Sequence, residues 1–102
     1  MNYRVILSPD AKADISSAVR WYQRRDPKLA FSFMLEVLAI RRRISQYPYQ
    51  FPLINGKVRR ALLKGFPYSV YYSLDNRTIS VIAVLHQRRA NTLWLERGNG
   101  RN

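Results

Sequence analysis

The first 46 residues combine short apolar runs with helix-start signals, which predicts a strand followed by two helices. Residues 3–7 are mostly apolar and partly β-branched, as is typical of a short strand. Ser8-Pro9 and Asp26-Pro27 each place a capping side chain before a proline, a common way for a helix to begin. Apolar residues then recur at helical spacing, so we expect helices at about residues 10–25 and 28–46.

The second predicted helix carries apolar residues on two sides. One stripe consists of Phe33, Val37, Ile40 and Ile44. A second stripe consists of Phe31, Leu35 and Leu38. A helix wedged between a partner helix and a sheet would bury both stripes, whereas a surface helix would keep the second stripe for a partner chain. We favour the wedged arrangement.

The remainder of the chain is predicted to form a sheet. Residues 47–56 contain Pro48 and Pro52 and are expected to form an ordered loop. Strands are expected at residues 57–63, 67–74 and 78–86. The last of them is apolar on both faces and should therefore be a central, covered strand.

Together these elements predict an α+β fold in a single domain, residues 1–97. It comprises an N-terminal strand, an antiparallel hairpin of two helices, a three-stranded antiparallel sheet and a short C-terminal helix at residues 91–97. Residues 98–102, Gly-Asn-Gly-Arg-Asn, are expected to be a disordered tail. A length of 102 residues with 47% hydrophobic residues suits one core without cross-links.

The composition excludes several classes of chemistry. With no cysteine, one histidine and six scattered carboxylates, the sequence offers no metal-ligand cluster, and we expect no metal and no cofactor. The four glycines match neither a Walker nor a Rossmann spacing. No apolar run approaches the roughly 20 residues that span a bilayer, and no signal peptide is evident, so a cytoplasmic protein without a membrane segment is expected.

The charge points to an anionic partner. Eighteen lysines and arginines against six acids leave a formal net charge of +12. Nucleic acid is one partner for such a field, and an acidic protein is another. Because most of the cations are arginines, which bind phosphate or carboxylate through a planar fork, we favour specific contacts over a merely solvated basic face.

Basic and aromatic residues gather on the predicted strands and just beyond their ends. They are Arg59, Arg60, Lys64, Tyr68, Tyr71, Tyr72, His86, Arg88 and Arg89. RNA cleavage without a metal needs a base, an acid and cations for the phosphate, and these residue types can supply all three. His86 titrates near neutrality when unperturbed, which makes it the candidate base. The competing interpretation is that His86 is a structural hydrogen-bonding residue and that the tyrosines pack across the strands.

Five segments in register resemble the RelE/ParE toxins of type II toxin–antitoxin systems, over about nine-tenths of the chain. The segments span residues 7–15, 18–22, 58–63, 66–72 and 81–89. The resemblance implies the same strand, helix, helix and three-strand order. It also implies a growth-inhibiting toxin of a plasmid-stabilisation type of module. An acidic antitoxin would neutralise such a toxin by wrapping its basic surface in a hetero-oligomer.

That superfamily includes ribosome-dependent mRNA endonucleases and DNA gyrase poisons. The endonucleases commonly carry an arginine directly after the strand tyrosine, where this sequence has Ser69, and a tyrosine or histidine near the C-terminus, where it has Trp94. We therefore favour a ParE-like toxin that binds and poisons DNA gyrase. The alternatives are a RelE-type endonuclease acting on mRNA at the ribosome and a non-toxic basic nucleic-acid-binding domain.

These considerations give three sets of candidate residues. The target-binding set is Arg59, Arg60, Lys64, Tyr68, His86, Arg88, Arg89 and Trp94. The catalytic candidates, should the protein be a nuclease, are His86, Arg59, Lys64 and Arg88. The antitoxin-binding set is Phe31, Leu35, Leu38, Arg41 and Arg42.

Overall fold

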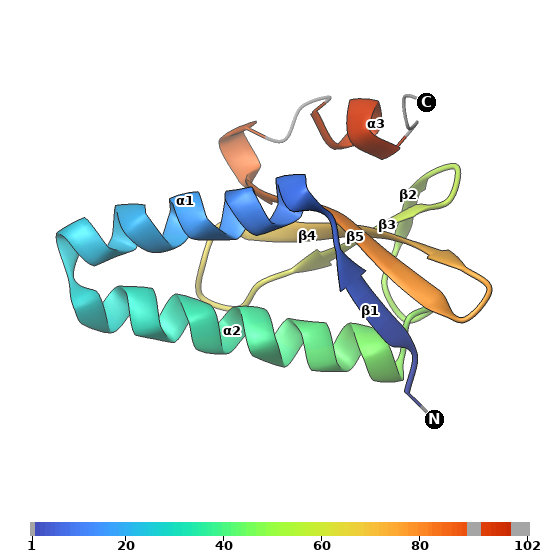
Figure 1. Ribbon diagram of the computed structural model, residues 1–102, viewed down its shortest axis with the longest axis horizontal. Helices are drawn as coiled ribbons and strands as arrows, with labels where there is room; N and C mark the ends of the chain where they lie inside the picture. Colours follow the sequence, from blue (N-terminus) through green and yellow to red (C-terminus); the bar gives the residue numbers. More distant parts are fainter. Residues whose placement is uncertain (1, 90–92, 99–102) are drawn as a thin grey trace.

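Two long helices and a five-stranded sheet dominate the computed structural model, which describes residues 2–89 and 93–98 (Figure 1). The elements in chain order are β1 (Arg4–Leu7), α1 (Pro9–Arg25), α2 (Pro27–Gln46), β2 (Leu53–Asn55), β3 (Val58–Leu62), β4 (Tyr68–Asp75), β5 (Thr78–His86), the 3₁₀ turn η1 (Gln87–Arg89) and α3 (Leu93–Gly98). Helices α1 and α2 form an antiparallel hairpin, as predicted, and the fold is α+β.

The predicted capping residues begin both helices. The Ser8 hydroxyl accepts a hydrogen bond from the Ala11 amide at 3.0 Å, and the Asp26 carboxylate accepts one from the Lys28 amide at 3.0 Å. Asp26 also ends α1, because its own amide donates to the Tyr22 carbonyl at 2.8 Å. A single residue therefore reverses the chain between the helices.

The sheet has the strand order β1-β5-β4-β3-β2. The three predicted strands are β3, β4 and β5, and they pair antiparallel. The sheet is wider than the three strands predicted. Strand β1 pairs parallel with β5, Arg4 opposite Thr78, and β2 pairs with β3 across a turn at Gly56, whose φ is +50°. The prediction of a loop over residues 47–56 was therefore wrong at β2, because Pro52 masks a short edge strand.

Strand β5 is interior but is not the middle strand of the sheet. It lies between β1 and β4, and β4 occupies the centre. Its side chains contribute to two clusters: Val81 and Val84 belong to the main core, and Ala83 and Leu85 to a smaller cluster on the other face. The change of face between Val81 and Ala83 coincides with a register shift in the pairing with β4. That second cluster includes Trp94 of α3, so β5 is covered on both faces, as expected.

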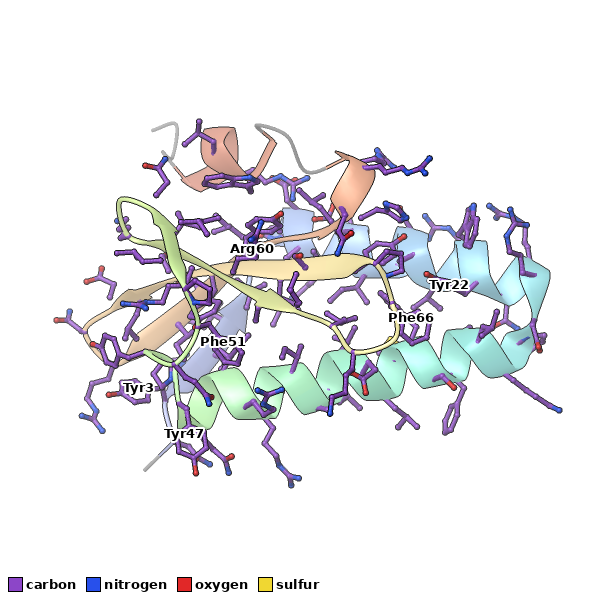
Figure 2. The ribbon with its side chains drawn as sticks, turned by 180° about the vertical axis from the view of Figure 1, so that it is seen from behind. Tyr3, Tyr22, Tyr47, Phe51, Arg60 and Phe66 are labelled. Atoms are coloured by element: carbon purple, nitrogen blue, oxygen red, sulfur yellow. The ribbon has the colours of Figure 1, made fainter. Side chains whose placement is uncertain are left out.

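The main core lies between the helical hairpin and the sheet. The stripe of α2 that contains Phe33 and Ile44 is buried in it, as predicted. An aromatic group closes one end of this core, and Figure 2 shows Tyr22 and Phe66 pointing toward each other there, with ring centroids 5.2 Å apart. None of the described helices is long and apolar enough to cross a membrane.

The second stripe of α2 contradicts the wedged arrangement that we favoured. Phe31, Leu35 and Leu38 are 67%, 50% and 53% exposed. The physical reason is geometric: α1 and the sheet both approach α2 from the side of its first stripe, so nothing in the described part of the chain covers the other side. The second stripe therefore remains a surface that a partner chain could cover.

Only part of the predicted C-terminal helix and tail lies within the described residues. Helix α3 overlaps the helix expected at residues 91–97 and extends one residue beyond it, whereas Asn91 and Thr92 lie outside the described residues. Of the expected tail, Gly98 ends α3, and residues 99–102 lie outside the described residues.

Candidate functional site

A pocket of ≈ 580 Å³ opens beside the carboxyl end of β5. Its lining comes from α1, the start of β4, the end of β5, η1 and α3. Figure 1 shows these segments together on the side of the molecule away from α2. The side chains that give the pocket its chemical character are Trp21, Tyr22, Tyr68, His86, Arg88 and Arg89.

Strand register brings the sheet residues of this pocket together. Tyr68 begins β4 directly opposite His86, the last residue of β5, and their rings meet edge to face at 5.2 Å. The Gln87 amide then donates to the Pro67 carbonyl at 2.8 Å, and the chain turns into η1. Arg88 and Arg89 are exposed on this turn, so two cations stand at the mouth of the pocket.

Beyond the end of β1, the edge of β5 is bound by the ion pair of Asp14 and Arg97. The pairing of β1 ends at Leu7 and Val81, and beyond it the Asp14 carboxylate accepts a hydrogen bond from the Val84 amide at 2.9 Å. Arg97 donates to both Asp14 oxygens, at 2.7 and 3.3 Å, and to the Ile82 carbonyl at 3.1 Å. The hydrogen bond to Asp14 raises the pKa of Arg97, so α3 is held against the strand by a permanent charge.

The hydrogen bonding of His86 defines what its ring can do. The Arg88 amide donates to Nδ1 of His86 at 3.1 Å, so Nδ1 acts as an acceptor and the proton of the neutral ring lies on Nε2. The Nε2–H group is then a donor. A ring in this state suits the binding of an acceptor better than the removal of a proton from a substrate.

Two phenol groups, those of Tyr22 and Tyr68, line the pocket. Burial raises the pKa of Tyr22, and the neighbouring Tyr68 raises it further. Burial also raises the pKa of Tyr68, against a lowering by Arg89 and with a further rise from Asp14. Both hydroxyls therefore stay protonated near neutrality and can donate hydrogen bonds.

A second hollow, of ≈ 560 Å³, lies along α2. Leu35, Leu38, Arg41 and Arg42 line it together with Tyr3, and Phe31 continues the exposed apolar stripe toward the start of the helix. Four of the five residues predicted to bind an antitoxin thus share one hollow. It combines apolar side chains with two cations.

Comparison with known proteins establishes the family. The family model described as the ParE toxin of the type II toxin–antitoxin system parDE matches residues 5–91. The chain belongs to the ParE toxin family. A chain in the solved structure of the chromosomal ParDE TA system from P. aeruginosa has the same fold, with a TM-score of 0.73 and 17% identity over 82% of this chain and 95% of that chain. No curated protein sequence matches.

In this ParE-family chain, some residues of the predicted target-binding set line the pocket and the others lie elsewhere. Tyr68, His86, Arg88 and Arg89 line the pocket. Arg59 instead donates to the Phe51 carbonyl at 2.8 Å and lies over the Tyr49 ring, which makes it part of the scaffold of the loop before β2. Arg60 is exposed on the same face of β3 as the buried Val58, opposite the helices.

Lys64 and Trp94 also lie away from the pocket. The Lys64 amide donates to the Glu36 carboxylate at 3.1 Å, and the lysine is exposed in the turn before β4. The Trp94 ring stacks on Tyr71 at 5.5 Å on the far face of the sheet. Ser69 is only 2% exposed, so no side chain reaches solvent from the position where the endonucleases commonly carry an arginine.

Sequence reasoning missed four residues that shape the pocket of this ParE-family chain: Asp14, Trp21, Tyr22 and Arg97. Asp14 and Arg97 form an ion pair across 83 positions of sequence, which no local pattern indicates. Trp21 offered a usable signal, because it falls outside the buried stripe of α1 and is 43% exposed. The described residues contain no group of three or more His, Cys, Asp or Glu side chains placed to hold a metal ion.

Proposed function

We propose that this ParE-family protein arrests growth by binding DNA gyrase in the cytoplasm through the face that carries the pocket. The observation that carries the proposal is the set of exposed cations, Arg88 and Arg89, beside the aromatic wall of Trp21 and Tyr68. Aromatic and arginine side chains around a hollow are the composition of a binding hot spot. The family favours such a toxin over a non-toxic basic nucleic-acid-binding domain.

The alternative, a RelE-type mRNA endonuclease, finds less support in the same residues. Two of its four catalytic candidates lie away from the pocket: Arg59 is bonded to loop carbonyls, and Lys64 lies in another turn. His86 lines the pocket, but its Nδ1 already accepts a hydrogen bond from the Arg88 amide. Arg88 alone remains free to hold a phosphate at the pocket. An acid, a base and a phosphate clamp are therefore not assembled around one point.

The proposed neutralising partner is an acidic antitoxin that covers the hollow of α2. An amphipathic segment would set its apolar face on Phe31, Leu35 and Leu38, and its carboxylates would meet Arg41 and Arg42. Such a hetero-oligomer would bury the largest apolar side chains that α2 leaves exposed. A small open reading frame for an acidic protein beside this gene is the genomic arrangement expected.

Two assays with the purified chain test the target. We expect inhibition of DNA supercoiling by purified gyrase, and an unchanged pattern of mRNA in a translating extract. An Arg88→Glu, Arg89→Glu double variant should lose the inhibition because it reverses the charge at the pocket mouth. Arg4→Glu, the same change on exposed β1, is the control and should retain inhibition. Codon-phased mRNA cleavage without an effect on gyrase would instead support the endonuclease.

A further inference from the structure

The pocket beside β5 has three chemically different zones. Trp21 and Tyr68 supply flat aromatic surface. Three lining residues that are buried or partly buried, Tyr22, Tyr68 and Asp14, carry polar groups and make up what we call the inner zone. The outer zone is cationic. A site that bound only an acidic surface would need no more than this outer zone of Arg88 and Arg89.

The inner zone is equipped for a ligand with its own polar edge. The charge of Asp14 raises the pKa of Tyr68 and that of Arg89 lowers it, and Tyr68 in turn raises the pKa of Tyr22, so these groups lie near one another along the pocket lining. Neither phenol hydroxyl has a hydrogen-bond partner among the described residues, and neither is sealed from solvent. Phenol donors beside a carboxylate acceptor match a group that carries both acceptors and an amine, such as the edge of a nucleobase.

The outer zone matches a phosphate. Arg88 and Arg89 are exposed on η1 and can offer paired N–H donors to a tetrahedral anion, and the Nε2–H of His86 adds a third donor from the end of β5. Arginine contacts of this kind are strong because both partners are charged.

We propose that the pocket binds a nucleoside 5′-phosphate unit, with its base against Trp21 and Tyr68 and its phosphate at Arg88 and Arg89. The volume of ≈ 580 Å³ lies within the range of about 300–1,000 Å³ typical of small-molecule sites. An apolar anchor from an acidic peptide would fill the same space but would leave the Tyr22 and Tyr68 hydroxyls without hydrogen-bond partners. This activity goes beyond gyrase binding and does not require it.

The two tryptophans allow a direct test by NMR. Trp21 lines the pocket, whereas Trp94 stacks on Tyr71 on the far face, so the two indole N–H signals report on opposite sides of the sheet. On titration of the ¹⁵N-labelled full chain with AMP or UMP, we expect the Trp21 signal to move and saturate while the Trp94 signal stays in place. Inorganic phosphate and adenosine should each produce a much smaller shift at equal concentration.

Variants then separate the zones. Arg89→Gln should weaken AMP binding at least about tenfold through loss of a charge-assisted contact. Tyr68→Phe, which keeps the ring and removes the hydroxyl, should weaken AMP and UMP binding while leaving the weak response to phosphate unchanged. Arg4→Gln, an exposed arginine on β1, is the matched control and should bind AMP like the unmodified chain.

A short single-stranded oligonucleotide tests whether the bound nucleoside 5′-phosphate is a free nucleotide or part of a strand. Tighter binding of the oligonucleotide than of AMP would identify a nucleotide within a strand, and equal binding would identify a free nucleotide; both support the proposal. Equal Trp21 shifts with phosphate and AMP would reduce the site to an anion patch and overturn it. So would a response to an acidic aromatic peptide but to neither nucleotide, or equal movement of both indole signals.

Discussion

Arg88 and Arg89 owe their exposure to the 3₁₀ turn that follows β5. At that turn the Arg88 amide donates to Nδ1 of His86, and neither arginine side chain forms an ion pair within the described part of the chain. Binding at this point depends on the sign of the charge, whereas catalysis by His86 would depend on its proton. The two roles therefore respond differently to substitution.

Substitution of these residues should separate the roles in cells. Arg88→Glu or Arg89→Glu is expected to abolish growth arrest, because like charges repel a complementary acidic patch. His86→Gln keeps a hydrogen-bonding side chain that does not titrate near neutrality, and it should retain much of the toxicity. Growth after induction, with soluble protein levels matched, measures both. Loss of a general base would cost about 10² to 10⁴ in rate, so a fully harmless His86→Gln would contradict the binding mechanism.

Asp14 should contribute strongly to stability. Asp14→Ala leaves the Val84 amide unpaired and Arg97 without its carboxylate, and we expect a loss of about 2 to 4 kcal/mol in the free energy of unfolding. Asp10→Ala is the matched control, since its carboxylate is exposed and lies 3.6 Å from the Arg97 Nε; it should cost less than about 1 kcal/mol. Urea unfolding of both variants tests this. Equal losses would show that the Asp14 pair does not hold α3.

At the scale of elements, the sequence predicted what local patterns encode. Ser8-Pro9 and Asp26-Pro27 marked both helix starts because capping and proline geometry act within one turn. The pairing of β1 with β5 joins residues more than 70 positions apart, which no local pattern specifies. The exposure of the second stripe of α2 could not be predicted from the sequence either, because it depends on which side of α2 the sheet approaches.

The loop before β2 is held by Tyr72, and its stability should depend on alkaline pH. The Tyr72 hydroxyl donates to the Pro48 carbonyl at 2.6 Å, and burial raises the pKa of Tyr72 to about 12 from a model-compound value of 10.0. The neutral phenol is favoured in the folded chain. Its contribution is complete below pH 10 and is lost as the pH rises toward 12, because the unfolded chain releases the proton first.

Tyr72→Phe should remove this contribution. We expect a cost of about 1 kcal/mol at pH 7 for the lost hydrogen bond, and a shallower fall in unfolding free energy between pH 10 and 12 than in the unmodified chain. The other tyrosines titrate in both proteins, so the difference between the two pH curves isolates Tyr72. Parallel curves would mean that Tyr72 titrates alike in the folded and unfolded chains.

Helix α2 offers a direct test of the antitoxin surface. Leu35→Asp or Leu38→Asp should change the free energy of unfolding by less than about 0.5 kcal/mol, because both side chains are half exposed. Either should weaken antitoxin binding at least about tenfold, by placing a carboxylate in an apolar contact and beside acidic partner groups. Leu62→Asp, 54% exposed on β3, is the control. Calorimetry with the neighbouring acidic protein would detect the difference.

At the scale of the whole molecule, the composition predicted the net charge, but it did not predict the pocket. Tyr68, His86, Arg88 and Arg89 were predicted because they are close in the sheet. Trp21 joins them from α1, some 50 residues earlier in the chain, only after the hairpin has folded onto the sheet. Arg59 shows the converse, since an arginine on a strand looked available for a target and is spent on the chain's own carbonyls.

The net charge of +12 should control the rate of encounter with acidic partners. We expect the association rate with the antitoxin to fall steeply as salt rises from low to physiological concentration, while the dissociation rate changes little. Stopped-flow or surface-based kinetics across a salt series measures both rates. An association rate that is flat across the series would show that electrostatic steering plays no part.

The use of Asp26 to end α1 and begin α2 has a consequence for any partner that contacts both hollows. Its amide donates to the Tyr22 carbonyl and its carboxylate accepts from the Lys28 amide, so one residue caps both helices. The α2 hollow and the pocket beside α1 therefore lie on helices that a single residue joins. A single partner segment that binds at both places needs a linker long enough to join them. Shortening that linker would detach one end of the segment although every contact residue stays the same.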